Sequence, residues 1–173
     1  ERKTTINDFC EGATRLIIGL TKKVLLANNL NLLVEAMFNV ETTSAGTAIG
    51  ISSSTVVGAW VGVIAYSMQV YFDFSGYSDM AIGMGRMFGF HFDENFRHPF
   101  MCRSISEFWQ RWHISLGSFF RDYLLYLPIF GKRRKYLSLF LVWFTTGLWH
   151  GASWSFIIWG LYFGTFILLE TIA

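Results

Sequence analysis

Charged side chains are scarce in this chain. Asp, Glu, Lys and Arg make up 15% of its 173 residues, whereas 53% are hydrophobic and 18% aromatic; an ordinary soluble domain is about 25% charged. Residues 42–72 and 136–169 contain no charged side chain at all. The first of these runs exceeds the roughly 20 residues that cross a ~30 Å hydrocarbon core. The composition therefore excludes an ordinary soluble domain and predicts an integral membrane protein.

Cysteine and net charge are also low. Cys10 and Cys102 stand alone without a Cys-x-x-Cys pattern, which excludes a disulfide framework and a zinc ribbon. A net charge of +2 is too small to indicate a nucleic-acid partner. The sequence has no initiator Met, no signal peptide at its start, and stops within an apolar stretch. We therefore expect it to be part of a longer polypeptide.

The first third of the chain predicts interfacial helices followed by one spanning helix. Residues 1–39 mix apolar side chains with Arg15, Lys22 and Lys23, which favours an interfacial or re-entrant helix over a full span. Residues 40–54 are rich in Thr, Ser and Gly and predict a loop. A spanning helix is expected from about residue 48 or 49 to near Asp73.

Two carboxylates then interrupt an apolar region. Asp73 and Asp79 predict a broken helix within residues 48–90. Irregular backbone at membrane depth is tolerated only when it is buried in protein or lines a cavity. This stretch is a candidate pocket wall. Gly83, Gly85 and Gly89 do not complete a dinucleotide loop, since Phe88 interrupts the pattern and no strand precedes it. They indicate close helix packing instead.

Residues 91–103 form a polar connector. His91, Asp93 and His98 could in principle meet on a metal ion, but their spacing fits no recognised zinc pattern. A solvated loop is the simpler interpretation, and we expect no metal here.

Residues 104–128 predict a single amphipathic helix. Ser104 and Glu107 have the spacing of a capping box, and one apolar stripe follows at helical spacing. Its members are Trp109, Trp112, Leu116, Phe119, Phe120, Tyr123, Leu124 and Leu127. Such a helix lies along the membrane interface or turns its polar side toward an aqueous funnel. His113 falls at the edge of the stripe, where a core histidine bonded to a backbone carbonyl is the plainer interpretation.

Trp149-His150-Gly151 places an imidazole inside a charge-free run. The four cations of residues 132–135 predict a cytoplasmic loop. A helix rising about 1.5 Å per residue from Tyr136 brings His150 roughly 21 Å away, and a second helix follows Gly151. An ionisable group at this depth is a functional-site hypothesis, although a hydrogen bond to a neighbouring helix would also account for it.

Several motifs together resemble the core of the membrane-bound O-acyltransferase family, above all its bacterial alginate and peptidoglycan O-acetylase branch. They are residues 71–89, Glu94-Asn-Phe-Arg-His-Pro-Phe100, residues 104–115, Phe120-Arg-Asp-Tyr123 and Gly147-Leu-Trp-His-Gly-Ala-Ser-Trp154. The resemblance implies an all-α, polytopic inner-membrane protein of bacteria. Residues 1–173 would be part of its catalytic core, with re-entrant and amphipathic helices and two helices in residues 136–173 that meet at His150.

The resemblance also implies acyl transfer to a hydroxyl within a membrane tunnel. His150 corresponds to the catalytic histidine, and His113 to its partner, which would orient the hydroxyl or donate to the oxyanion. The implied donor is acetyl-CoA or another acyl donor on the cytoplasmic side, used as a substrate and not as a bound cofactor. The acceptor would be an extracytoplasmic polysaccharide or a partner acetylase. Further expected tunnel residues are Trp149, Trp112, Arg111, Arg121, Asp122, Asp73 and Asp79.

One departure leaves the acyl group open. After Arg121-Asp-Tyr123 the related sequences usually continue with a Pro-Leu-Gly-Gly-Asn-Arg type turn, which this chain replaces with residues 127–135. D-alanyl or other acyl transfer is therefore an alternative. So is a transporter in which Asp73, Asp79, Arg86 and His150 bind a solute at broken helices, although no internal repeat is visible. A scaffold that recruits a periplasmic acetylase is a third alternative.

Overall fold

The computed structural model describes residues 4–38, 40–43, 46–49, 55–126 and 134–172. It divides the chain into two compact units, Glu1–Asp93 and Glu94–Ala173. The described part is predominantly helical, which confirms the predicted all-α class. Within these described residues, three helical stretches are long and apolar enough to cross a membrane by length and composition, namely Ile6–Phe38, Val56–Met87 and Trp154–Ile172.

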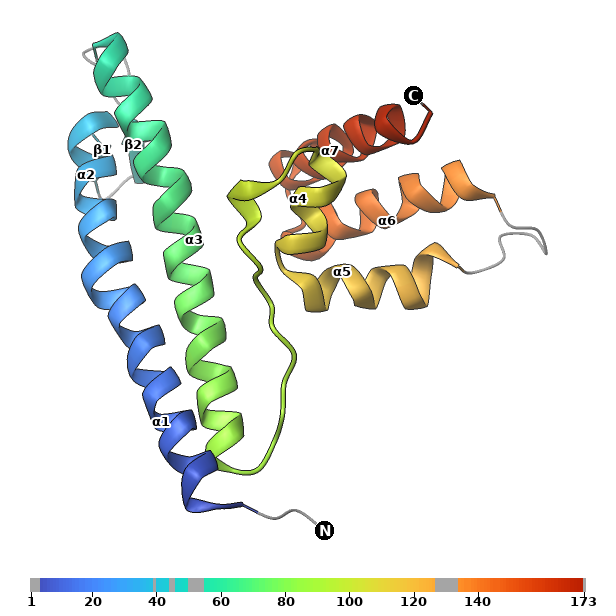
Figure 1. Ribbon diagram of the computed structural model, residues 1–173. Coiled ribbons are helices and arrows are strands. Elements are labelled where there is room, and N and C mark those ends of the chain that lie inside the picture. Colours follow the sequence, from blue (N-terminus) through green and yellow to red (C-terminus); the bar gives the residue numbers. More distant parts are fainter. Residues whose placement is uncertain (1–3, 39, 44–45, 50–54, 127–133, 173) are drawn as a thin grey trace. The chain divides into compact units, whose positions relative to one another are not determined.

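A long helical hairpin forms the first unit. Its first arm runs without interruption through α1 (Ile6–Thr21), the π-helical turn η1 (Lys22–Ala27) and α2 (Asn28–Phe38). Thr5 and Asp8 close a capping box at its start. The second arm is α3 (Val56–Met87), and the two arms run side by side in opposite directions (Figure 1). The first arm, expected to be interfacial, thus has the length and composition of a candidate span.

Glycines bring the two arms into backbone contact. A Cβ built on Gly12 would lie 2.6 Å from the Gly83 carbonyl oxygen, and one on Gly19 would lie 2.6 Å from the Gly76 carbonyl oxygen. No side chain fits at such a spacing, so only glycine permits this approach. The predicted close packing at Gly83 is confirmed.

The predicted break in α3 is wrong. The helix runs through Asp73 and Asp79 without interruption, because basic side chains of the first arm meet both carboxylates. Asp79 pairs with Arg15 at 2.9 Å and with Lys22 at 2.6 Å, and Asp73 pairs with Lys23. Ion pairing satisfies these carboxylates where the sequence suggested irregular backbone.

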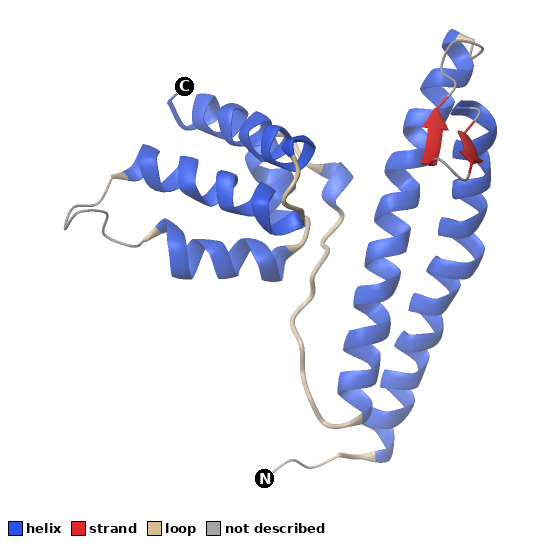
Figure 2. Cartoon of the chain, turned by 180° about the vertical axis from the view of Figure 1, so that it is seen from behind, coloured by secondary structure: helices blue, strands red, loops and turns tan. Residues whose placement is uncertain are grey.

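The start of α3 also differs from the prediction. Residues expected to be loop or helix form two short antiparallel strands, β1 (Val40–Thr43) and β2 (Gly46–Ile49), in the register Val40 to Ile49. They lie beside the end of the hairpin where α2 stops (Figure 2). The helix begins only at Val56. Thr55 is its N-cap, and the Thr55 hydroxyl accepts a hydrogen bond from the Gly58 amide.

The second unit begins with the short helix η3 (Pro99–Met101) and then α4 (Ile105–Arg111), α5 (Ile114–Phe120) and the π-helical turn η4 (Arg121–Leu125). The continuous helix predicted over residues 104–128 is therefore wrong; residues 127–128 lie outside the described part. The backbone departs from the helix at extended Trp112 and at His113, whose φ of 48° lies in the left-handed region. The described members of the predicted apolar stripe are thus spread over α4, the break, α5 and η4.

The helices α6 (Lys135–His150) and α7 (Trp154–Ile172) form a tight hairpin. A Cβ on Gly160 would lie 2.5 Å from the Trp143 carbonyl oxygen, and one on Gly147 would lie 2.5 Å from the Phe156 carbonyl oxygen. The predicted meeting of two helices at His150 is confirmed. With 16 residues, α6 is about 24 Å long, which is too short to cross a ~30 Å hydrocarbon core. Of the predicted basic run, residues 132–133 lie outside the described residues.

Candidate active site

His150 ends α6, next to the turn that leads into α7. Its Nδ1 lies 2.8 Å from the Thr146 carbonyl oxygen one helical turn earlier. The indole of Trp159 lies 4.9 Å from the imidazole, centroid to centroid, and that of Trp149 lies 5.0 Å away. The imidazole thus has a fixed orientation and aromatic neighbours, while its residue remains exposed in this chain.

His113 occupies the break between α4 and α5. Its Nδ1 lies 3.2 Å from the Asn95 Oδ1, and its ring centroid lies 6.1 Å from that of Trp149. The side chain is half-buried, and this burial, with the neighbouring His150 as a second cause, lowers the pKa of His113 to about 4. The imidazole is therefore neutral near pH 7. Its partner is a side-chain amide, where the plainer sequence interpretation expected a backbone carbonyl.

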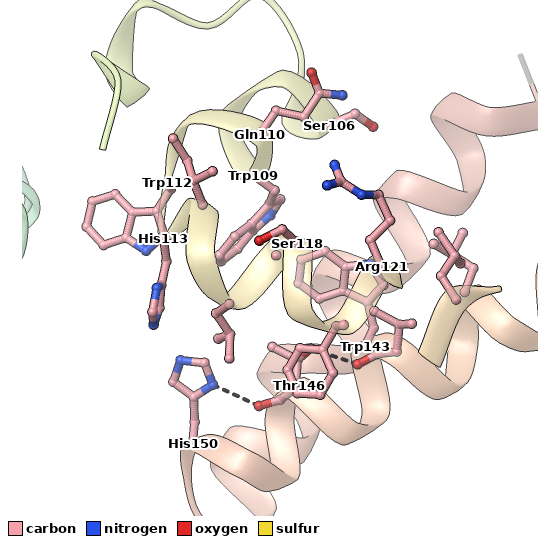
Figure 3. Close-up of a pocket in the computed structure, with 17 residues that line it drawn as sticks. Ser106, Trp109, Gln110, Trp112, His113, Ser118, Arg121, Trp143, Thr146 and His150 are labelled. Carbon is pink, nitrogen blue, oxygen red and sulfur yellow. Dashed lines mark hydrogen bonds between the residues drawn. The ribbon is translucent and has the colours of Figure 1, made fainter. Parts of the chain in front are cut away.

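The two histidines line one pocket of about 300 Å³ within the second unit. Figure 3 shows their rings turned toward one another, that of His113 from the break before α5 and that of His150 from the end of α6, with Arg121 set apart from them. The remaining polar lining includes Ser106, Gln110, Ser118 and Thr146. A pocket of this volume is at the lower end of the range for small-molecule sites.

The other expected residues of this unit divide into two groups. Trp112 and Arg121 line the pocket that holds the two histidines. Trp149, Arg111 and Asp122 are not among its described lining residues: Trp149 contacts both imidazoles from the side, Arg111 pairs with Glu107, and Asp122 pairs with Arg121 at 3.1 Å.

Asp73 and Asp79 belong to the first unit, where both are held in ion pairs. Asp79 lines a separate, open pocket with Arg15 and Arg86. No group of three or more His, Cys, Asp or Glu residues that could hold a metal ion occurs in the described ranges.

Sequence reasoning missed two residues that support the site. Asn95 holds His113, and the Glu170 carboxylate accepts hydrogen bonds from the amides of Ile105 and Ser106 at the start of α4, at 2.8 and 2.9 Å. Asn95 lies in a motif noted for its resemblance to the family, but its 18-residue separation from His113 matches no local pattern. Glu170 is 64 residues from Ser106, so only the fold relates them.

Long apolar helices in the described residues are typical of a membrane protein, and two imidazoles line a pocket of its second unit. Residues 9–173 match the membrane-bound O-acyltransferase family. The chain belongs to this family.

Curated relatives match between 65% and 98% of the chain. A protein of Azotobacter vinelandii named "Probable alginate O-acetylase" is 46% identical over 173 residues, which are 98% of this chain and 32% of that protein. The "Peptidoglycan O-acetyltransferase" of Helicobacter pylori is 44% identical over 85% of this chain and 27% of its own length. The "Teichoic acid D-alanyltransferase" of Bacillus subtilis is 35% identical over 65% of this chain and 31% of its own length. The chain thus spans about a third of the length of these relatives.

Proposed function

We propose that the complete protein transfers acetyl groups from a donor on the cytoplasmic side to a hydroxyl of an extracytoplasmic polysaccharide. The observation that carries this proposal is the pair of imidazoles of His150 and His113, turned toward one another in one pocket. Transfer to a hydroxyl needs a base for its proton, and a neutral imidazole is the usual base near pH 7.

His150 is the proposed general base. A carbonyl oxygen can only accept a hydrogen bond, so the contact with Thr146 O makes the Nδ1 of His150 the donor. In the neutral ring Nε2 then carries the lone pair. It takes the proton of the acceptor hydroxyl while the oxygen attacks the acyl carbon; the bond to the donor's leaving group breaks, and the leaving group receives the proton from the imidazolium. Base catalysis of this kind contributes about 10²- to 10⁴-fold.

We assign the donor to the cytoplasmic side and the acceptor to the opposite side of a bacterial inner membrane that the protein crosses several times. Acetyl-CoA, or an acyl carrier derived from it, is the proposed donor. It acts as a substrate and leaves after transfer. A polysaccharide, directly or through a partner acetylase, is the proposed acceptor. The names of the two acetylating relatives support the acetyl group and the polysaccharide acceptor in this proposal.

D-alanyl transfer is the second candidate function. The relative named teichoic acid D-alanyltransferase favours it, and a pocket of about 300 Å³ has room for either small acyl group. The transporter alternative is less well supported, because the two carboxylates that it needs for a solute are already paired with Arg15, Lys22 and Lys23. Hydrolysis of envelope polymers with identification of the released acids distinguishes acetyl from D-alanyl transfer.

His150→Ala in the full-length protein tests the proposal. We expect acetylation of the exported polymer to fall to background while the amount of protein in the membrane stays unchanged, because the base is lost and the helix end is retained. His91→Ala is the matched control, since His91 is exposed and belongs to the first unit, and it should acetylate normally. Normal acetylation by the His150 variant would end the enzyme hypothesis.

A further inference from the structure

Asn95 holds the break between α4 and α5 from a distant part of the sequence. Its backbone carbonyl accepts a hydrogen bond from the Ile114 amide at 3.0 Å. Its side-chain Oδ1 faces three groups: the Ser115 amide at 3.1 Å, the Ser115 hydroxyl at 2.9 Å and the His113 Nδ1 at 3.2 Å. The neighbouring Phe96 ring packs edge-on against Trp112, with centroids 5.0 Å apart. The segment is thus anchored beside His113.

The Ser115 amide settles which atom of the Asn95 side chain faces His113. A backbone N–H can only donate, so the atom that it meets must be the amide oxygen and not the nitrogen. The same oxygen faces the His113 Nδ1, and an oxygen without a proton can only accept. Nδ1 must therefore carry the proton, and in the neutral ring Nε2 is left with the lone pair.

We propose that Asn95 is a positioning residue which locks His113 in the Nδ1–H tautomer, so that His113 acts in the pocket as a hydrogen-bond acceptor and not as the oxyanion donor. This inference rests on the proposed acyl transfer for its functional meaning. Its structural part, the tautomer, stands independently of the reaction.

The lock has a chemical consequence for the pair. His150 is fixed in the same tautomer by Thr146 O, so both rings present a lone pair. Two acceptors cannot bond each other, and they bind a group that donates. An incoming hydroxyl can give its proton to His150, while His113 accepts a hydrogen bond from a second donor on the acceptor molecule or from a water beside it. With the single proton of the neutral ring on Nδ1, His113 could donate through Nε2 only as an imidazolium. Its low pKa of about 4 disfavours that form and agrees with the role of acceptor.

A purely structural role for Asn95 predicts a different pattern. The Oδ1 also accepts the Ser115 amide and hydroxyl near the start of α5, so loss of Asn95 could simply weaken this turn. Ser115→Ala separates the two roles: it removes the Ser115 hydroxyl, which donates to Asn95 Oδ1 and lies 3.5 Å from the His113 Nδ1, and it leaves the shorter contact of 3.2 Å between Asn95 and His113 in place. Ser115 is exposed and is not among the described lining residues of the pocket.

The direct test is the ¹⁵N spectrum of the ring nitrogens in the full-length protein, labelled at histidine and held in lipid nanodiscs at pH 7. The His113 signals are assigned by their loss in His113→Gln. We expect a protonated Nδ1 and an unprotonated Nε2 in the wild type and in Ser115→Ala. In Asn95→Ala we expect the proton to move to Nε2 in a large share of the molecules. A wild-type His113 protonated at Nε2 would overturn the inference even if Asn95→Ala fails to fold.

Kinetics of the same proteins test the functional part. Asn95→Ala should lower kcat by about tenfold or more with KM changed less than about twofold, because the ring keeps its place but loses its orientation. Asn95→Asp, which keeps the accepting oxygen, should retain the Nδ1–H tautomer; Ser115→Ala should stay within about threefold of wild type. Equal losses of kcat in Ser115→Ala and Asn95→Ala would overturn the positioning role. An inactive wild type with the expected tautomer would count against the proposed function alone.

Discussion

At the scale of single residues, His113 combines three unusual properties: left-handed backbone, a lowered pKa and a side-chain partner from a distant segment. Burial is the first cause of the lowered pKa, and the charge that His150 would carry is the second. Both causes penalise the imidazolium form. The ring is therefore suited to remain neutral while protons move through the pocket.

The titration of His113 can be predicted with its sign. With a pKa of about 4 in the folded protein against about 6.5 in an unfolded chain, the ring stays neutral as the pH falls from 7 to about 5. Between those two pKa values the unfolded chain binds more protons, so acid lowers stability through this group. We expect ¹⁵N titration of the full-length protein to give a midpoint near 4.

His150→Gln separates the two causes. It removes the second one, so the midpoint of His113 should rise but remain below 6.5, because burial is the larger cause. A midpoint at 6.5 in the wild type would contradict the burial argument.

Much of this residue-level site could be predicted from the sequence, because an imidazole in a charge-free run is conspicuous. His150 emerges from that contrast alone, and His113 emerges from the family resemblance. Asn95 could not be predicted as a partner, because amides are common in polar connectors and nothing local relates residue 95 to residue 113. The tautomer of His113 depends on that contact, so it needed the fold.

At the scale of elements, Glu170 holds the start of α4 from near the end of α7. Its two oxygens accept the amides of Ile105 and Ser106, while the Ser104 hydroxyl accepts that of Glu107. The first amides of a helix have no acceptors within that helix. The Glu170 carboxylate therefore provides the acceptors for two amides at the start of α4.

Glu170→Ala should therefore lower the melting temperature of the protein, since two helix-capping hydrogen bonds to the start of α4 are lost. Glu170→Gln keeps one accepting oxygen and should lose less. Thermal unfolding of the full-length protein in detergent measures both. Thr171→Ala is the control, because that hydroxyl donates to the Ile167 carbonyl of its own helix and not to α4. A loss in the control equal to that of Glu170→Ala would refute the capping role.

The elements of the second unit were only partly predictable. The Ser104 cap is confirmed, although the Glu107 side chain accepts from the Arg103 amide and not from Ser104 as a full capping box requires. The break after Arg111 was missed, because apolar spacing continues through Trp112 and carries no sign of a left-handed residue. In the first unit, Asp73 and Asp79 suggested a break that ion pairs made unnecessary, and those partners are 50 and 57 to 64 residues away.

At the scale of the whole molecule, the basic segment before α6 predicts the orientation in the membrane. Lys135 is exposed at the start of α6, and positive loops favour the cytoplasmic side. Lys135→Cys in a cysteine-free full-length protein should react with a membrane-impermeant maleimide only after the inner membrane is opened. The same protein without the new cysteine is the control. Labelling with the inner membrane intact would reverse the proposed sidedness of donor and acceptor.

The membrane class was predictable because it depends on composition, which no tertiary contact changes. The arrangement within each unit was less so. Contacts such as Gly12 with Gly83 or Gly147 with Phe156 depend on which helix faces which, and a single sequence does not contain that information.

Residue 113 must adopt a left-handed backbone conformation and also carry the imidazole of the pocket. A side chain with a Cβ gives up about 1 kcal/mol or more to adopt this conformation, whereas glycine adopts it freely. Selection for thermal stability alone would therefore favour His113→Gly, which removes the imidazole. Libraries that rank variants by melting temperature would accordingly enrich for folded but inert molecules, and any such screen needs an activity readout beside it.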